Sequence, residues 1–218
     1  MKINGVITGD VINSTSVPLG LRKDLLDALT GVMDDIKKVV GLRYEVFRGD
    51  SIQVVVENPA ESMLVALLMK AGLRSRTPQS EGSLWDMRVA VGVGKVEFLA
   101  DGVAMSDGEA FRLSGRGLDA IGKATVALAT PWTDVNAEFA VSLPFVDDVI
   151  ENWTVGQSAQ MFQALLHNIP QKDMARQFGV SAQTVSRTLI LAREKPVRSF
   201  LERFNTVITN KVEEGVCL

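Results

Sequence analysis

The sequence contains almost no cysteine or histidine, which limits the metal and redox chemistry open to it. Cys217 is the single cysteine and His167 the single histidine among 218 residues. One cysteine excludes an intramolecular disulfide, and the two residues together exclude a cysteine cluster or a multi-histidine metal site. We therefore expect both residues to be structural or incidental.

Long hydrophobic runs are also missing from the sequence. The longest, residues 63–69, ends at Lys70, whereas a membrane-spanning helix needs about 20 apolar residues. The N-terminal stretch meets Asp10 after only a few apolar residues, too few for a secretory signal. Because 46% of the residues are hydrophobic, the chain can bury one sizeable core and a small second domain. We expect a soluble, cytoplasmic protein with no membrane partner.

Basic residues are outnumbered overall, but not towards the C-terminus. The net charge is −3, yet residues 156–218 hold 8 Lys and Arg against 5 Asp and Glu, whereas residues 1–155 hold 15 against 21. This local excess is modest, so a monomer would bind DNA weakly. Dimerisation would help by doubling the phosphate contacts.

Residues 169–192 form two short helical patterns separated by a sharp turn. Pro170 suits the first helical position, Gly179 can end that helix in the left-handed conformation, and Ser181 can cap the next helix. Val185 and later apolar residues recur at helical spacing. This pattern is typical of a helix-turn-helix, whose second helix enters the major groove of DNA. The alternative is an ordinary αα-hairpin within a helical core.

The outward side chains of this segment suit contacts with DNA. Gln can bond adenine and Arg can bond guanine bidentately, so Gln183 and Arg187 are the candidates for reading bases. Hydroxyl and ammonium groups suit phosphates. The candidate DNA-contacting residues are Lys172, Ser181, Gln183, Thr184, Ser186 and Arg187.

The first part of the chain alternates strand and helix patterns. Strands are predicted at residues 2–8, 42–47, 52–56 and 88–96, with helices at 21–39 and from the cap residue Asn58 onwards, a polar loop at 74–83 and a helical segment at 107–123. Residues 125–129 and 138–143 are predicted to add edge strands. This order predicts an α+β, ferredoxin-like domain with helices on one face of an antiparallel sheet.

A domain boundary is predicted near residues 151–156. We expect a ferredoxin-like domain at residues 1–152 and an all-α helix-turn-helix domain at residues 153–218, with Trp153 between them and Thr154 capping a helix at 155–166. A last helix begins at Pro196 and carries a broad apolar stripe. That stripe either covers the small domain or pairs with its copy in a homodimer.

Two Gly-Asp pairs stand at related places in the predicted sheet. Asp10 follows Gly9 at the end of the first strand, and Asp50 follows Gly49 in the hairpin between the next two. Two carboxylates beside bare glycine backbone suit Mg²⁺ that carries the phosphates of a nucleotide, and Arg116 could meet a phosphate. The alternative is that Gly-Asp merely builds turns, with Asp50 paired to Arg48.

Several short blocks resemble a known family in their order. GDVINS (residues 9–14), GDSIQ (49–53), RVAVGVG (88–94) and DGEAF (107–111), followed by Arg116 and the helix-turn-helix, resemble the blocks of the bacterial SatD family. The first part also looks like a remote class III nucleotidyl cyclase domain, whose core is ferredoxin-like. That resemblance implies metal-binding aspartates at Asp10 and Asp50 and a phosphate-contacting arginine at Arg116.

The chain departs from the cyclase pattern at three positions and from the SatD pattern at one. Val46 stands where that family has an adenine-reading lysine, Arg112 near its transition-state asparagine and Met105 near its base-contacting aspartate. Ser51 replaces the acidic residue that SatD-like chains carry after Gly-Asp. The chain therefore lacks the side chains with which the cyclase family selects the base and stabilises the leaving pyrophosphate. It keeps the residues that would bind a metal or a nucleotide.

Three functions are therefore compatible with the sequence. The leading hypothesis is a homodimeric DNA-binding regulator of transcription, not an enzyme, in which a degenerate cyclase-like domain senses a nucleotide or mediates dimerisation. The second is an enzyme that uses Mg²⁺ on Asp10 and Asp50 to bind or convert a nucleotide. The third is a protein-interaction module. A regulator of this kind requires no cofactor. The Gly-Asp turns predict Mg²⁺ with a nucleotide as an optional ligand.

Overall fold

The computed structural model describes residues 2–47, 49–78, 84–98 and 102–216. Arg48, considered above as a partner of Asp50, and Cys217 lie outside the described residues, as does most of the second half of the predicted loop at 74–83. One sheet contains the strands β1 (Lys2–Val11), β2 (Leu42–Phe47), β3 (Ser51–Val56), β4 (Met87–Phe98), β5 (Asp107–Gly108) and β6 (Val126–Ala129).

The helices are α1 (Arg22–Lys37), α2 (Ser62–Ser75), α3 (Glu109–Asp119), α4 (Thr133–Glu151), α5 (Val155–His167), α6 (Gln171–Phe178), α7 (Ala182–Leu191) and α8 (Glu194–Val216). Four short 3-10 turns accompany them: η1 (Ser14–Ser16), η2 (Leu19–Leu21), η3 (Pro59–Glu61) and η4 (Val103–Met105). None of the helices among the described residues is both long and apolar enough to cross a membrane.

β1 runs through the middle of the sheet, antiparallel to β3 on one side and to β4 on the other. The strand order is β2-β3-β1-β4-β5, and β6 pairs in parallel with β4. The α+β class and the predicted order of strand, helix, two strands, helix and strand are confirmed. Because side chains alternate along a strand, Ile7 of β1 faces the cluster under α1 and α2, whereas Val6 faces α3.

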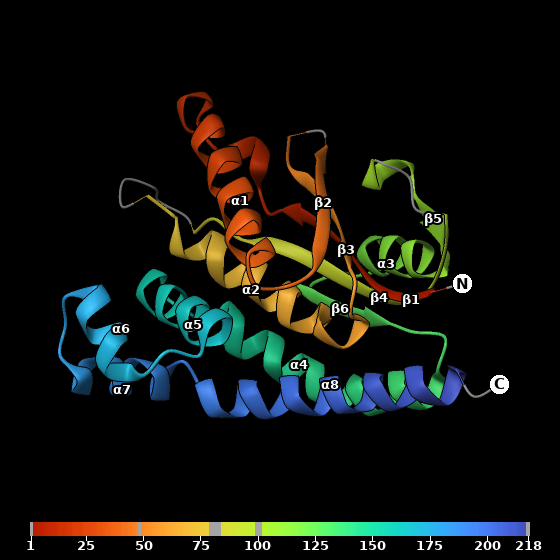
Figure 1. Cartoon of the computed structure of the whole chain (residues 1–218). Coiled ribbons are helices and arrows are strands. Elements are labelled where there is room, and N and C mark those ends of the chain that lie inside the picture. The colour runs from red at the N-terminus through yellow and green to blue at the C-terminus, as the bar shows by residue number, and fades with distance from the viewer. Residues whose placement is uncertain (1, 48, 79–83, 99–101, 217–218) are drawn as a thin grey trace.

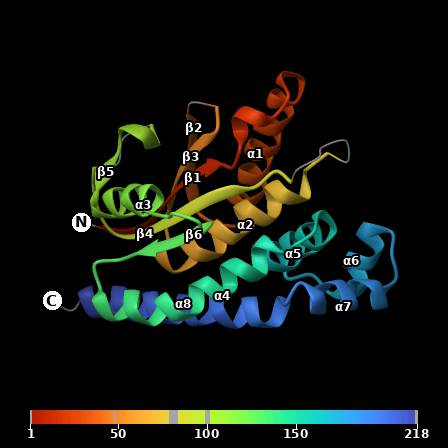
Figure 2. The ribbon, with the colours of Figure 1, turned by 180° about the vertical axis from the view of Figure 1, so that it is seen from behind.

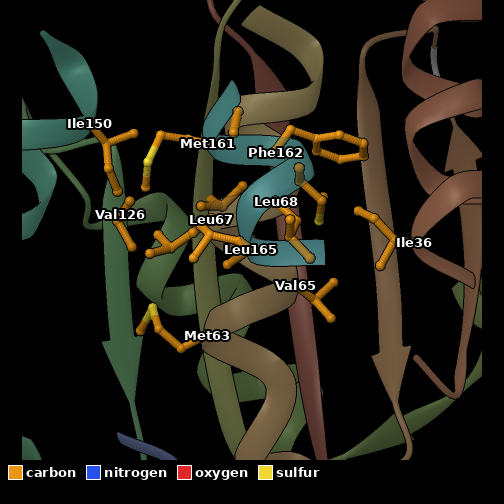
Figure 3. Packing of buried hydrophobic residues seen from close by; sticks show 14 of the residues in the cluster. Ile36, Met63, Val65, Leu67, Leu68, Val126, Ile150, Met161, Phe162 and Leu165 are labelled. Atoms are coloured by element: carbon orange, nitrogen blue, oxygen red, sulfur yellow. The ribbon is translucent and has the colours of Figure 1, made fainter. Parts of the chain in front are cut away.

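The helices form two layers on one side of the sheet and one layer on the other. α1 and α2 cover the first face and α3 the second, while α4 and α8 lie side by side further out (Figures 1 and 2). Figure 3 shows Leu67 and Leu68 of α2 among Met161, Phe162 and Leu165 of α5. A helix that is apolar all round is buried on all sides, which explains the unbroken apolar run at residues 63–69.

Residues 138–143 are helical, so the edge strand predicted there is wrong. They belong to α4, in which Val135, Phe139, Leu143 and Ile150 are buried. The spacing between these residues has the helical period rather than the strand period. Pro144 lies inside α4 on its exposed side. The strand predicted at residues 125–129 is confirmed as β6.

The residues predicted to cap the starts of the α2 and α5 segments form the expected capping hydrogen bonds. The backbone N–H of Ala60 donates to Asn58 Oδ1 at 3.2 Å, ahead of η3 and α2. Thr154 caps α5 and forms a capping box with Gln157. At its other end α2 extends to Ser75, so the polar loop predicted from residue 74 begins later, and Arg74 is buried.

The two helical patterns of residues 169–192 are present as α6 and α7. Gly179 ends α6 with φ +64°, and the backbone N–H of Thr184 donates to Ser181 Oγ at 3.1 Å. A separate helix-turn-helix domain is not shown for these described residues, because Val185 and Leu189 belong to the same hydrophobic cluster as the sheet. The division into residues 1–152 and 153–218 stays a prediction.

The apolar stripe of α8 packs against its own chain. The helix begins at Glu194, slightly before the predicted start, and the Phe200 and Phe204 rings lie 5.7 and 5.4 Å from the ring of Phe139 on α4. Trp153 is buried beside it and donates Nε1–H to the carbonyl of Ala192 at 2.9 Å. The stripe therefore gives no ground for a homodimer, which stays a prediction.

Tyr44 provides a test of the packing between β2 and α1. Its hydroxyl donates to Asp34 Oδ1 at 2.7 Å, and burial, followed by this hydrogen bond, raises the pKa of Tyr44 to about 12. The unfolded value is about 10, so the contribution to stability is complete below that pH and is lost as pH rises through about 12.

Because Tyr44 is the only tyrosine, a spectrophotometric titration of tyrosinate absorbance reports it alone. We expect the native chain to titrate near 12, the unfolded chain near about 10, and Asp34→Asn in between. A native titration that coincides with the unfolded one would contradict this packing.

Candidate functional site

The C-terminal end of β1 lies between the β2–β3 hairpin and the first residues of β4. Asp10 is in register with Ser51 of β3 and with Arg88 of β4. The backbone N–H of Val11 donates to the carbonyl of Asp50 at 2.9 Å. The ladder thus brings the backbones of Asp10 and Asp50 to one edge of the sheet, although they are far apart in the sequence.

Asp10 is held by an arginine. Arg88 Nε donates to Asp10 Oδ1 at 3.1 Å and Arg88 Nη2 to Oδ2 at 2.5 Å, a bidentate fork. This hydrogen bonding, with the nearby negative charge, raises the pKa of Arg88, so the guanidinium stays charged. The side chains of Asp10 and Arg88 are 26% and 40% exposed, so a solute can reach both.

Asp50 is held by hydroxyl groups instead. Ser14 Oγ donates to Asp50 Oδ2 at 2.7 Å, and Ser51 Oγ donates to Oδ1 at 3.4 Å. Asp50 forms no ion pair with any residue that the structure describes. Its negative charge is therefore not neutralised by those residues, in contrast to that of Asp10.

A cleft of about 220 Å³ lies beside Asp50, between the hairpin, the loop after β1 and the start of α1. Asn13, next to the lining residue Ser14, has a positive φ of 53°, and Gly49, which lines the cleft, has one of 82°. Glycine takes that conformation without a steric penalty. The residues that line the cleft are Ser14, Thr15, Arg22, Leu25, Leu26, Gly49 and Asp50.

Gly9 has a packing role at this edge. It is buried, and a Cβ atom there would lie 3.0 Å from both the carbonyl oxygen of Arg88 and Cε of Met87. The absence of a side chain lets β1 approach β4 closely, which places Arg88 against Asp10. The two glycines thus differ: Gly9 permits close strand packing, and Gly49 permits the turn.

A buried ion pair fixes the first residues of β4. Lys70 of α2, fully buried, donates to Asp86 Oδ1 at 3.0 Å and to the Met87 carbonyl at 2.7 Å. The Asp86 carbonyl in turn accepts the N–H of Ile12 at 2.9 Å. Burial lowers the pKa of Lys70, against the raising effect of Asp86. Arg74 Nε adds an ionic contact 3.5 Å from Asp86 Oδ2.

Arg116 lies on α3 at the end nearest this site. A Cβ atom at Gly117 would lie 3.3 Å from that of Ala90, two residues from Arg88. Arg116 is exposed, and its side chain forms no hydrogen bond or ion pair with any residue described by the structure. Its guanidinium is thus available, but no contact joins it to Asp10 or Asp50.

The positions that the cyclase resemblance assigns to base recognition and to the transition state are occupied differently. Val46 packs half-buried against the main core, and Met105 is 71% exposed in η4. Arg112 pairs with Glu97 and Asp107, towards the far end of β4 from Arg88. None of these three side chains contributes to the Asp10–Asp50 edge.

The residues predicted to contact DNA lie on the surface of α6, α7 and the turn between them. Five of them are exposed and Ser186 is half-buried. Ser181 caps α7 by accepting a hydrogen bond from the backbone N–H of Thr184. The exposed residues are Lys172, Ser181, Gln183, Thr184 and Arg187. The helices α6 and α7 lie far from the hairpin between β2 and β3 (Figure 1).

Sequence reasoning assigned no role to Arg88, Ser14 or Lys70. Arg88 and Ser14 stand in the blocks quoted above, and a single cation at the head of the otherwise apolar strand Val89–Val91 was the available signal. Lys70 looked like the polar end of an apolar run. Its burial becomes apparent only in the folded structure, where it pairs with Asp86.

Neither a known family model nor a curated protein matches the sequence. Among solved structures, the guanylyl cyclase Cya2 is 20% identical over 54% of this chain and 70% of its own, with a TM-score of 0.45. The dimeric guanylyl cyclase domain of RhoGC from Blastocladiella emersonii is 18% identical over 55% and 74%, with a TM-score of 0.44. A bacterial light-regulated adenylyl cyclase is 11% identical over 65% and 80%, with a TM-score of 0.48.

These similarities concern the fold alone. The cyclase-like expectation for the first part of the chain is confirmed at that level, whereas membership of the SatD family and the helix-turn-helix domain are not confirmed.

The leading hypothesis, a DNA-binding regulator of transcription, is contradicted by these comparisons. The solved structures to which this chain is similar are guanylyl and adenylyl cyclases. The physical reason is that the signals used were not exclusive. A capped turn and exposed polar residues such as Gln183 and Arg187 occur on any surface helical hairpin, and the local basic excess is small.

The buried ion pair yields a prediction about stability. Asp86→Asn leaves the ammonium of Lys70 buried without its carboxylate, and breaking a buried pair in this way typically costs about 3–5 kcal/mol. We expect the urea midpoint of unfolding to fall accordingly. Asp27→Asn removes the partner of exposed Lys23 and is the matched control, with little expected change. Equal midpoints for Asp86→Asn and the unsubstituted chain would refute the assignment.

Proposed function

We propose that the chain is an enzyme that binds a nucleoside triphosphate together with Mg²⁺ at the edge formed by Asp10, Asp50 and Arg88, and converts it there. The observation that carries this proposal is the register of β1. It sets Asp10 beside Arg88 and sets the next residue, Val11, in a hydrogen bond to the carbonyl of Asp50. The main chains of Asp10, Asp50 and Arg88, from three separate segments, thereby come to one edge of the sheet.

The residues present fit Mg²⁺. The donor set consists of hard carboxylate oxygens, and among the described residues the oxygens of Asp50 are engaged only by the hydroxyls of Ser14 and Ser51. No cluster of three or more acidic, histidine or cysteine side chains occurs among the described residues. Mg²⁺ characteristically takes one or two carboxylates and completes its shell with water and phosphate oxygens. Asp10 and Asp50 would hold it.

Bound there, Mg²⁺ would neutralise phosphate oxygens and polarise the phosphorus for attack. Arg88 would supply the positive charge for a second phosphate, because a guanidinium fork matches two phosphate oxygens as it matches a carboxylate. Ser14 keeps Asp50 in place through its 2.7 Å hydrogen bond. Gly49, with a positive φ, permits the turn of the hairpin that carries Asp50.

The chain would recognise the nucleotide by its phosphates rather than by its base. Val46 is packed into the core, Arg112 is engaged in two ion pairs, and Met105 is apolar and exposed. These residues provide no hydrogen bonds matched to adenine or guanine. ATP and GTP are therefore expected to bind with similar affinity.

The proposal is tested by equilibrium dialysis of ATP and GTP with and without Mg²⁺, followed by chromatography of the products. We expect binding that needs Mg²⁺, falls at least about tenfold in Asp50→Asn because one carboxylate charge is lost, and gives a product that disappears in Asp10→Asn. Asp148→Asn, an exposed site on α4, is the control and should bind normally. Binding that is indifferent to both Mg²⁺ and Asp50→Asn would rule out the proposed site.

A further inference from the structure

The Arg88–Asp10 ion pair occupies one of the two carboxylates that the proposed function assigns to Mg²⁺. Both carboxylate oxygens of Asp10 accept hydrogen bonds from Arg88. Asp50 carries no such cation among the described residues and accepts only from Ser14 and Ser51. A metal ion that arrives alone therefore meets one open carboxylate and one that is already neutralised.

The main chain around Arg88 is fixed, so its side chain alone can change partner. Lys70 holds the Met87 carbonyl at 2.7 Å on one side, and the N–H of Val89 donates to the Thr125 carbonyl at 2.9 Å on the other. The Arg88 side chain forms hydrogen bonds only with Asp10 among the described residues, and it is 40% exposed. Its guanidinium can leave Asp10 without any movement of β4.

A phosphate group offers the guanidinium an equivalent partner. Arginine binds carboxylate and phosphate with the same two-pronged geometry. Mg²⁺ alone brings no anion for Arg88, whereas a polyphosphate brings one group for Arg88 and further oxygens for the metal. The polyphosphate therefore draws Arg88, which competes with the metal for Asp10, away from that carboxylate.

We infer that Arg88 exchanges Asp10 for a phosphate of the ligand, and that this exchange frees Asp10 for Mg²⁺. The inference rests on the proposed function and adds a regulation to that site: the metal and the polyphosphate bind cooperatively, and each binds weakly alone. Coupling of this kind is reciprocal, so each ligand raises the affinity of the other by the same factor. Mg²⁺ without phosphate therefore binds weakly, and a nucleoside without phosphate does not raise its affinity.

The test begins with Mn²⁺ alone, titrated into the full chain and followed by electron paramagnetic resonance of the free ion. Arg88→Met removes the competing cation, so Mn²⁺ should bind about fivefold more tightly than to the unsubstituted chain, the factor expected for a partly exposed ion pair. The same variant should bind ATP with Mg²⁺ more weakly, because the phosphate loses its guanidinium.

Arg203→Met is the matched control for this test. Arg203 grips Glu138 with the same fork, Nε to Oε1 and Nη2 to Oε2, but on α4 and α8 away from the site. Both affinities should be unchanged in this variant. Circular dichroism and thermal unfolding establish that each variant is folded as the unsubstituted chain is.

The opposite signs of the two effects separate exchange from a structural role. Unchanged or weaker Mn²⁺ binding in Arg88→Met would overturn the inference, and so would an increase of both affinities, since Arg88 would then only compete. If the unsubstituted chain binds no nucleotide with Mg²⁺, the proposed function fails. The Mn²⁺ titration, which contains no nucleotide, separately shows whether Arg88 competes for Asp10.

Discussion

The buried ion pair between Lys70 and Asp86 is the constraint on which the candidate site depends. An ammonium taken out of water is costly unless it is paired and hydrogen-bonded, and Lys70 meets both needs through Asp86 and the Met87 carbonyl. The pair thereby fixes the main chain immediately before Arg88. Through the hydrogen bond from Ile12 to Asp86 it also fixes the loop that carries Ser14. Both partners of the site's aspartates are thus positioned from one buried point.

The C-terminal helices are joined to the same point. Arg74, one helical turn after Lys70, donates through Nη1 to the carbonyl of Ile150 and through Nη2 to that of Glu151 at 2.8 Å. These carbonyls end α4, just before α5 packs on α2. The helices that suggested a separate DNA-binding unit are therefore attached, through α4 and α5, to the helix that supports the site.

Much of the fold was accessible from the sequence because its signals are local. Asn58 and Pro59 predict the start of α2, and Thr154 predicts the start of α5. The short loop with Gly49 predicts the hairpin between β2 and β3. The edge strand predicted at residues 138–143 failed because a short apolar window does not separate strand from helix. The Arg88–Asp10 pair could not be predicted, because it depends on the register of two strands whose residues are 78 positions apart. The burial of Lys70 could not be predicted either, because it depends on the contact of this side chain with Asp86 in the folded chain.

The central claim is that Asp10 and Asp50 hold one metal ion beside a polyphosphate. The most direct measurement is a crystal structure of the full chain with Mn²⁺ and a non-hydrolysable ATP analogue, with anomalous scattering used to locate the metal. The account predicts one anomalous peak in contact with carboxylate oxygens of both aspartates, with Arg88 turned from Asp10 to a phosphate. A peak elsewhere, or a bound nucleotide with the Arg88–Asp10 pair intact, would contradict it.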